Sequence, residues 1–524
     1  ALLLLLPLPT ACRHAGTASL PPAVAAGLAA TPGAHLRGEV QGLAPHAVLD
    51  RKDFHYALAW APRSDAVAFS HLGPHDFQLS LWRVGQGAQP LSDGSVNPLD
   101  FEVEGLAYSP DGRQVAAASR DGRVHLYDAA SGRALAQAAL DEPQVSVAFH
   151  PSGRSLVAGG ARGRLTVLAL PTLALVSEAS GHAGEVRALA FAPDGTLYSG
   201  GWDQHLRVWR TAEEPLAQDG ARLRFVREGG FLQVRGTVNG RAPARFAVDL
   251  RAPAVVLGAQ AAGAAGVDVG ALKETRVLPT PLGSTQVRVA RGQTLRLGTL
   301  QLDGVDVAVC DACVPEGAQG VLGAPVAELL EVQVDEVAGE VQLTRKAPAS
   351  EPAPRGLVLR ADAAYALGAF VNDLSLDARG ERLGVALSVP RAERTVAIYR
   401  REKAGVKEPL SAHNAAVLVE ARSGRVLQRW VHHAGVVATA GISPDGRSVA
   451  SGGWDKQLFV FGEGAAEPRA QQAFGFSVRR VRFSPDGQLL GVAAWTPQNV
   501  AQKSDPAAVL YRVQYRDARV ALPQ

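Results

Sequence analysis

Residues 181–209 read GHAGEVRALAFAPDGTLYSGGWDQHLRVW, and they give the clearest indication of the fold. An alternating apolar segment leads into the turn Ala192-Pro193-Asp194-Gly195, and a second segment rich in small and β-branched residues follows. Proline presets φ at the first corner of such a turn, and glycine tolerates a positive φ at its end. The stretch therefore predicts antiparallel strands joined by a tight turn.

The same strand–turn–strand pattern recurs along the whole chain. Turns of this kind close at residues 64, 112, 153, 195, 380, 446 and 487. Four of the six intervals are 41 to 48 residues long, the length of one four-stranded propeller blade. A single such sheet cannot bury both faces, so we expect an all-β fold in which seven sheets stack as blades in a ring. A strand near 46–49 is expected to pair into the last blade and close the ring.

One copy of the pattern carries a fuller motif: Gly181-His182, then Ser199-Gly200-Gly201-Trp202-Asp203, then Val208-Trp209. It resembles a complete WD40 repeat. The resemblance implies a buried hydrogen-bond network that locks one blade, formed here by His182, Ser199, Asp203 and Trp209. These residues are expected to be structural, because a buried polar network is costly unless every member is paired.

A later copy repeats the motif with one change. It contains His433, Ser451 and Asp455, but Phe461 stands where the WD40 pattern has tryptophan, which removes the indole donor. Asp121 keeps the turn aspartate in a third copy and leads to Tyr127. The resemblance to WD40 repeats covers about 300 residues and predicts a seven-bladed WD40-type β-propeller.

Two intervals are too long for one blade. The 66-residue interval contains the charged, turn-rich segment 391–413, which we expect to be an elongated hairpin or loop on one rim. The 185-residue interval is long enough for an additional domain, at 220–348. Blades one to four then occupy 46–215 and blades five to seven 355–524. The insert either interrupts the fourth blade, with 356–360 as its displaced outer strand, or follows that blade.

The insert has a likeness of its own. An Asn239-Gly240 hairpin turn leads into Ala244–Asp249. The segments Gly320–Gly323, Val332–Asp335 and Glu340–Leu343 follow in order. This order resembles one lobe of the retropepsin-like aspartic proteases, with Gly283-Ser284 where a flap would lie. The resemblance implies an active site made by two copies in a homodimer, each supplying one aspartate, here Asp249.

Peptidase chemistry in that family depends on two carboxylates that share one proton. The family motif is Asp-Thr-Gly, whereas this chain has Asp249-Leu250-Arg251. Leu250 cannot make the bracing hydrogen bond of the threonine. Arg251 adds a cation that favours the ionised carboxylate and so opposes proton sharing. We therefore expect a non-catalytic lobe, with an aspartic peptidase that uses Asp249 as the alternative.

Cys310 and Cys313 form a lone Cys-x-x-Cys pair in the insert. No histidine or second cysteine pair lies nearby to complete a zinc site. The preferred interpretation is a short structural disulfide, and the alternative is a free or redox-active pair. No metal or other cofactor is expected anywhere in the chain.

The first residues suggest export. Leu2–Leu6 is an apolar run too short to span a bilayer, and Thr10-Ala11-Cys12 follows it. This arrangement resembles the lipobox of bacterial lipoproteins, which implies a signal peptide at 1–12 and a lipid on Cys12. The alternative is a conventional signal peptide cut near Ala11. Residues 13–45 are rich in Ala, Pro and Gly and are expected to be a tether.

Charge and motifs narrow the function. The net charge is +3 and the charges are scattered, so no basic stripe predicts nucleic-acid binding. Metalloprotease, serine-hydrolase and phosphate-loop motifs are missing from the sequence. We expect a lipid-anchored interaction platform on the bacterial cell envelope. Its protein or peptide partner would bind the propeller rim and the insert. The alternative is a membrane-tethered aspartic peptidase.

Overall fold

The fold was analysed in a computed structural model of the chain. It describes residues 34–50, 55–72, 77–84, 89–90, 96–99, 102–140, 142–215, 220–241, 243–280, 283–336, 339–346, 355–388, 413–475, 477–495 and 508–522. Cys12 and nearly all of the segment 391–413 lie outside these residues, so the expectations for them remain predictions.

Seven of the sheets in the described residues belong to the propeller. The first three contain β2 (His55–Trp60), β3 (Ala66–Leu72), β4 (Phe77–Arg83), β5 (Gln89–Pro90) and β6 (Val96–Leu99); β7 (Val103–Tyr108), β8 (Gln114–Ser119), β9 (Arg123–Asp128) and β10 (Ala134–Ala139); and β11 (Gln144–Phe149), β12 (Ser155–Gly160), β13 (Arg164–Ala169) and β14 (Ala174–Ser180). The fourth contains β15 (Val186–Phe191), β16 (Leu197–Gly201), β17 (His205–Pro215) and β29 (Arg355–Ala366).

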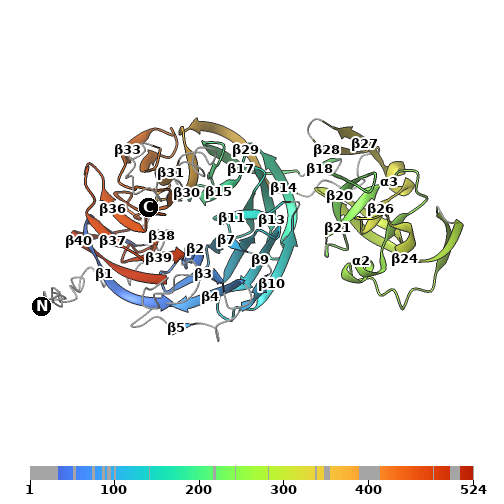
Figure 1. The fold of residues 1–524 in the computed structure, drawn as a ribbon, viewed down its shortest axis with the longest axis horizontal. Helices are drawn as coiled ribbons and strands as arrows, with labels where there is room; N and C mark the ends of the chain where they lie inside the picture. The colour runs from blue at the N-terminus through green and yellow to red at the C-terminus, as the bar shows by residue number, and fades with distance from the viewer. Residues whose placement is uncertain are drawn as a thin grey trace, which may run out of the picture.

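The remaining propeller sheets follow the insert. They contain β30 (Phe370–Leu376), β31 (Arg382–Ser388), β32 (Ala415–Glu420) and β33 (Val426–Trp430); β34 (Val437–Ile442), β35 (Ser448–Gly453), β36 (Gln457–Gly462) and β37 (Ala470–Ala473); and β38 (Ser477–Phe483), β39 (Leu489–Trp495), β40 (Ala508–Ala521) and β1 (His35–Asp50). Figure 1 shows these sheets arranged in a ring around a common axis. The expectation of an all-β propeller is confirmed.

The inner strands close the ring. The first strand of each blade contacts the first strand of the next, in the cycle β2, β7, β11, β15, β30, β34, β38 and back to β2. Both faces of a blade are covered as a result. Ala116 and Ala117 are neighbours on β8 whose side chains point to opposite faces, and both are fully buried, in different apolar clusters.

Glycine in the second strand of a blade permits this close stacking. Gly200 and Gly452 occupy the same place in the two WD40-like motifs. A Cβ at Gly200 would collide with Val371 on the inner strand of the following blade, and one at Gly452 would collide with Val478 in the same way. The small residues that mark these strands are therefore required by the contact between neighbouring blades.

The last blade is completed by the N-terminal strand. β1 pairs with β40 in antiparallel register from His35↔Ala521 to Asp50↔Ala508. A closing strand was expected near 46–49, but β1 already begins at His35, so the tether predicted at 13–45 is about ten residues too long. Gly38, Gly42 and Pro45 hid this strand, because they are typical of linkers in sequence. In the structure Gly42 and Pro45 pair with Gln514 and Tyr511, and Gly38 lies at a bulge of the same strand.

The insert interrupts the fourth blade. β29 pairs with β17 from His205↔Ala366 to Pro215↔Arg355, so the insert lies between the third and fourth strands of that blade. This settles the alternative left open by the sequence. The segment 356–360 belongs to the displaced fourth strand. Figure 1 shows the insert beside the ring, and Arg235 donates to the carbonyl oxygen of Leu140 at 2.8 Å.

Two sheets and short helices form the insert. The smaller sheet contains β18 (Gly220–Arg224), β28 (Glu340–Arg345) and β27 (Leu330–Asp335). The larger sheet contains β19 (Val226–Glu228), β20 (Phe231–Val238), β21 (Pro243–Val248), β26 (Gly320–Leu322), β22 (Val255–Leu257), β25 (Leu300–Val309), β24 (Gly283–Leu297) and β23 (Thr275–Thr280). The helices are α2 (Ala259–Ala264), α3 (Ala324–Leu329) and the 3-10 turn η1 (Asp311–Cys313). None of the described helices has the length and apolar character needed to cross a membrane.

Candidate functional site

Asp249 lies in the loop that follows β21, where three strands meet. β26 lies between β21 and β22, parallel to the first and antiparallel to the second. The backbone N–H of Asp249 donates to the carbonyl oxygen of Leu322 at 3.2 Å. A Cβ at Gly323 would collide with the carbonyl oxygens of Ala252 and Ala254. The segment Gly320–Gly323 therefore supports this loop from behind.

The carboxylate of Asp249 is held by its own loop. Its Oδ1 accepts from the backbone N–H of Arg251 at 3.2 Å and from the Arg251 side chain at 3.4 Å. The Asp249 side chain is 27 % exposed, whereas that of Arg251 is 93 % exposed. Arg251 therefore places a solvated guanidinium beside the carboxylate, at the position where the family motif has glycine.

The hairpin β23–β24 stands where a flap was expected. Gly283 pairs with Thr280, and Ser284 pairs with Pro279, so both lie at the tip of the hairpin. The hairpin packs into the lobe, because Leu278 and Val287 belong to a buried cluster that also contains Val256.

Cys310 and Cys313 form a disulfide, with their Cα atoms 5.4 Å apart. The bridge spans the end of β25 and η1. Asp311, between the two cysteines, accepts a hydrogen bond from the backbone N–H of Ala259 at 2.7 Å. The pair therefore shapes a turn beside α2. No cluster of metal-ligating side chains occurs in the part of the chain that the structure describes.

The complete WD40-like motif forms a continuous network. His182 hydrogen bonds Asp203 through Nδ1 at 2.8 Å and Ser199 through Nε2 at 2.7 Å. The indole N–H of Trp209 donates to Ser199 at 2.8 Å. Burial alone would raise the pKa of Asp203, but hydrogen bonds from His182 and Arg207 outweigh it and hold that pKa well below its usual range.

The second motif keeps the network without tryptophan. His433 lies 2.9 Å from both Asp455 and Ser451. Phe461 stacks on Trp430, with ring centroids 5.0 Å apart. Aromatic packing therefore fills the place of the missing indole donor. In the third copy, Asp121 accepts from the backbone N–H of Arg123 at 2.9 Å and so closes its own turn.

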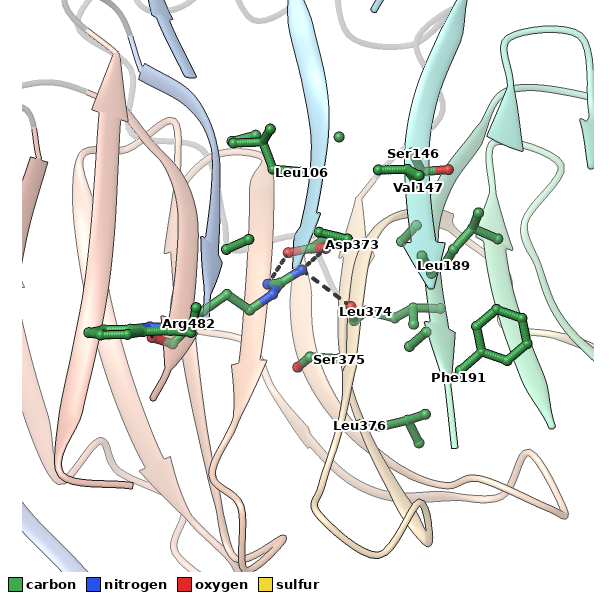
Figure 2. A pocket seen from close by; sticks show the side chains of 18 of the residues that line it. Leu106, Ser146, Val147, Leu189, Phe191, Asp373, Leu374, Ser375, Leu376 and Arg482 are labelled. Carbon is green, nitrogen blue, oxygen red and sulfur yellow. Dashed lines mark hydrogen bonds and ion pairs between the residues drawn. The ribbon is translucent and has the colours of Figure 1, made fainter. Parts of the chain in front are cut away.

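The inner strands surround a cavity of about 460 Å³, which we call the central channel. Residues from six of the inner strands line it, and β34 is the exception. Figure 2 shows apolar side chains along its wall, among them Leu106, Val147 and Leu189. Arg482 extends across to Asp373, and Figure 2 draws the hydrogen bonds between them.

Charged side chains on or beside the inner strands β7, β15, β30 and β38 lie close together, and Arg120 joins them from the turn after β8. We call Arg120, Arg187, Arg479, Arg480 and Arg482 the arginine cluster. Arg120 pairs with Glu104 at 2.6 Å and with Glu185 at 3.3 Å, and Arg187 also pairs with both. Asp373 has a fully buried side chain and pairs with Arg480 and Arg482, each at 2.7 Å.

The arginine cluster was not predicted from the sequence. One feature of the sequence nevertheless indicates it, because Glu104 and Arg187 each stand two positions before an apolar residue, Leu106 and Leu189. Charges at the start of otherwise apolar inner strands are unusual for a buried sheet. Their convergence, however, depends on the closed ring, which brings Glu104 and Arg480 together over 376 positions.

Three family models match separate parts of the chain. The model described as WD domain, G-beta repeat matches residues 174–210 and 424–461, which contain both networks. The model of the anaphase-promoting complex subunit 4 WD40 domain matches residues 58–147. The aspartyl protease model matches residues 234–326, from β20 to α3.

Curated relatives are similar over part of the propeller. Pre-mRNA-processing factor 19 homolog 2 of Arabidopsis thaliana is 27 % identical over 30 % of this chain and 32 % of its own. Eukaryotic translation initiation factor 3 subunit I of Drosophila pseudoobscura pseudoobscura is 28 % identical over 29 % and 50 %. A guanine nucleotide-binding protein subunit beta of Oryza sativa subsp. indica is 32 % identical over 26 % and 39 %. The chain thus spans a third to a half of these relatives.

Proposed function

We propose that this chain, a WD40-type β-propeller carrying an inserted aspartyl-protease-family lobe, is an exported, lipid-anchored platform that binds a protein or peptide partner without cleaving it. The propeller rim and the lobe provide the binding surface. The lipid on Cys12 holds the protein at the bacterial cell envelope. The WD40 relatives support the interaction role.

The contact between Asp249 and Arg251 is the observation that carries this proposal. Proton sharing between two carboxylates requires that one of them be neutral. In this chain the Asp249 carboxylate is instead engaged within its own loop by the Arg251 side chain, 3.4 Å away. Leu250 has no hydroxyl to brace the loop. Changes of this kind in a catalytic site lower rates by orders of magnitude.

A peptidase assay tests the absence of cleavage. The purified full chain is incubated with an unfolded protein substrate at mildly acidic pH, beside Asp249→Asn and with or without pepstatin. We expect all samples to leave the substrate intact. Cleavage that pepstatin inhibits and Asp249→Asn abolishes would contradict the proposal.

The lipid anchor requires its own test. The chain is produced in a bacterial host that is fed labelled fatty acid, and Cys12→Ser is the matched variant. We expect label in the parent protein and none in the variant, which should leave the membrane fraction. Unlabelled parent protein in the soluble exported fraction would favour the conventional signal peptide.

The second candidate function is an aspartic peptidase that is active as a homodimer. The strand arrangement around Asp249 favours it, because β26 supports the loop from behind. Replacing Leu250→Thr and Arg251→Gly together restores the family motif. If the parent chain already cleaves substrate, this candidate is correct. If only the double variant cleaves, the lobe keeps the geometry and has lost the chemistry.

A further inference from the structure

The arginine cluster carries more positive charge than its carboxylates offset. Its five guanidinium groups face Glu102, Glu104, Glu185 and Asp373, which leaves one positive charge in excess. Arg479 accounts for the excess, because among the described residues it makes no hydrogen bond or ion pair, although it lies within electrostatic range of Glu104 and Arg187. The cluster therefore carries one positive charge that no carboxylate among the described residues offsets.

Burial makes this excess costly. Arg479 is only partly exposed, and burial together with the nearby Arg187 charge lowers its pKa. The Nε atom of Arg187 is also buried without a hydrogen-bond partner. A buried donor that stays unpaired costs free energy, and so does an uncompensated buried charge. An anion placed among these groups would offset both costs.

The cavity beside the cluster suits a particular kind of anion. Arg187, Arg480 and Arg482 contribute to its lining, so guanidinium groups border it on two sides of the ring. Further along the strands the wall is apolar, with Leu106, Val147 and Leu189 (Figure 2). A volume of about 460 Å³ is within the range of small-molecule sites. The planar fork of a guanidinium matches a carboxylate or phosphate group.

We propose that the central channel binds a small molecule with one oxyanion head and an apolar body. The head contacts Arg187 and Arg480, which line the cavity, and Arg479, which occupies the same bulge position in β38 as Arg187 does in β15. The body lies along the leucine-lined wall. Excess positive charge selects the head, and the apolar strands select the body. This site is separate from Asp249, so the proposal does not depend on whether the lobe cleaves peptides.

Matched probes test the two halves of the ligand. Binding of hexanoate, acetate and hexylammonium to the full chain is measured by calorimetry at constant ionic strength. We expect hexanoate to bind, acetate to bind at least several-fold more weakly, and hexylammonium not to bind. Undetectable hexanoate binding at millimolar concentration, or equal binding of hexylammonium, would overturn the proposal.

Arg479→Gln separates a ligand role from a structural one. Because Arg479 has no ion pair to lose, the melting temperature without ligand should stay the same or rise. Hexanoate affinity should fall about tenfold, the effect of one charge-assisted hydrogen bond. Arg154→Gln, in the exposed turn after β11, is the control and should bind as the parent does. Equal affinity in both variants, or a large fall in melting temperature for Arg479→Gln, would refute the assignment.

Discussion

Arg482 on β38 and Asp373 on β30 are 109 positions apart and meet through two hydrogen bonds of 2.7 Å in the central channel. The hydroxyl of Thr439 on β34 donates to the same carboxylate at 2.6 Å. One fully buried aspartate thus joins the inner strands of three consecutive blades. A propeller is held together mainly by contacts between neighbouring sheets. This contact joins the three blades that follow the insert in sequence.

Removing the Asp373 charge should therefore destabilise the ring. Asp373→Asn leaves Arg480 and Arg482 without a counter-charge, and breaking a buried pair in this way costs about 3–5 kcal/mol. We expect a loss of this order in urea unfolding. Asp362→Asn is the matched control, because Asp362 pairs with Arg210 on the surface and should cost below about 1 kcal/mol. Equal losses in the two variants would argue against the buried network.

Stability should fall in acid. Burial opposes the ionised forms of Asp373 and Glu104, but nearby arginines outweigh it and lower the pKa of each to about 2. Their contribution is fully present above the unfolded pKa of about 4 and is lost as the pH falls through about 2. We expect the free energy of unfolding to decline from about pH 5 downward. Asp373→Asn should show a shallower decline, and an unchanged slope would contradict this origin.

The complete blade network should depend on its indole. Trp209→Phe removes the donor to Ser199 and leaves a buried hydroxyl with one partner fewer, at a cost of about 1–2 kcal/mol. Thermal and urea unfolding measure the loss. Trp454→Phe, at a half-exposed tryptophan, should change stability by less than about 0.5 kcal/mol. A neutral Trp209→Phe would mean that packing alone fills this position, as Phe461 does in the later copy.

The disulfide should stabilise the insert modestly. It closes a loop of very few residues, so its effect on the unfolded chain is roughly 2 kcal/mol. We expect reduction to lower the unfolding free energy of the insert by this amount. The double replacement Cys310→Ser and Cys313→Ser should match the reduced protein and be insensitive to reductant. A response of that variant to reductant would place the effect elsewhere.

Much of the architecture could be predicted because it depends on patterns of residues that are close together in sequence. Each blade is indicated by local features: the Pro-Asp-Gly turns, the Gly200 and Gly452 positions and the interval near 42 residues. These features recur because every blade has to bury both faces of its sheet. The partners of His182 follow from the same local repeat. The predicted N-terminal strand was too short, because Gly42 and Pro45 are typical of linkers and adopt strand structure here by pairing with β40.

The channel site was not predictable in this way. Glu104, Asp373 and Arg480 lie in different blades, and nothing in the local sequence of each indicates that the three meet. They come together because ring closure places the starts of all the inner strands around one axis. The repeated blades, the inserted lobe and the altered Asp249 motif can be predicted from the sequence, since they depend on neighbouring residues. Which charges share the channel is known only from the folded chain, because that depends on distances between residues far apart in sequence.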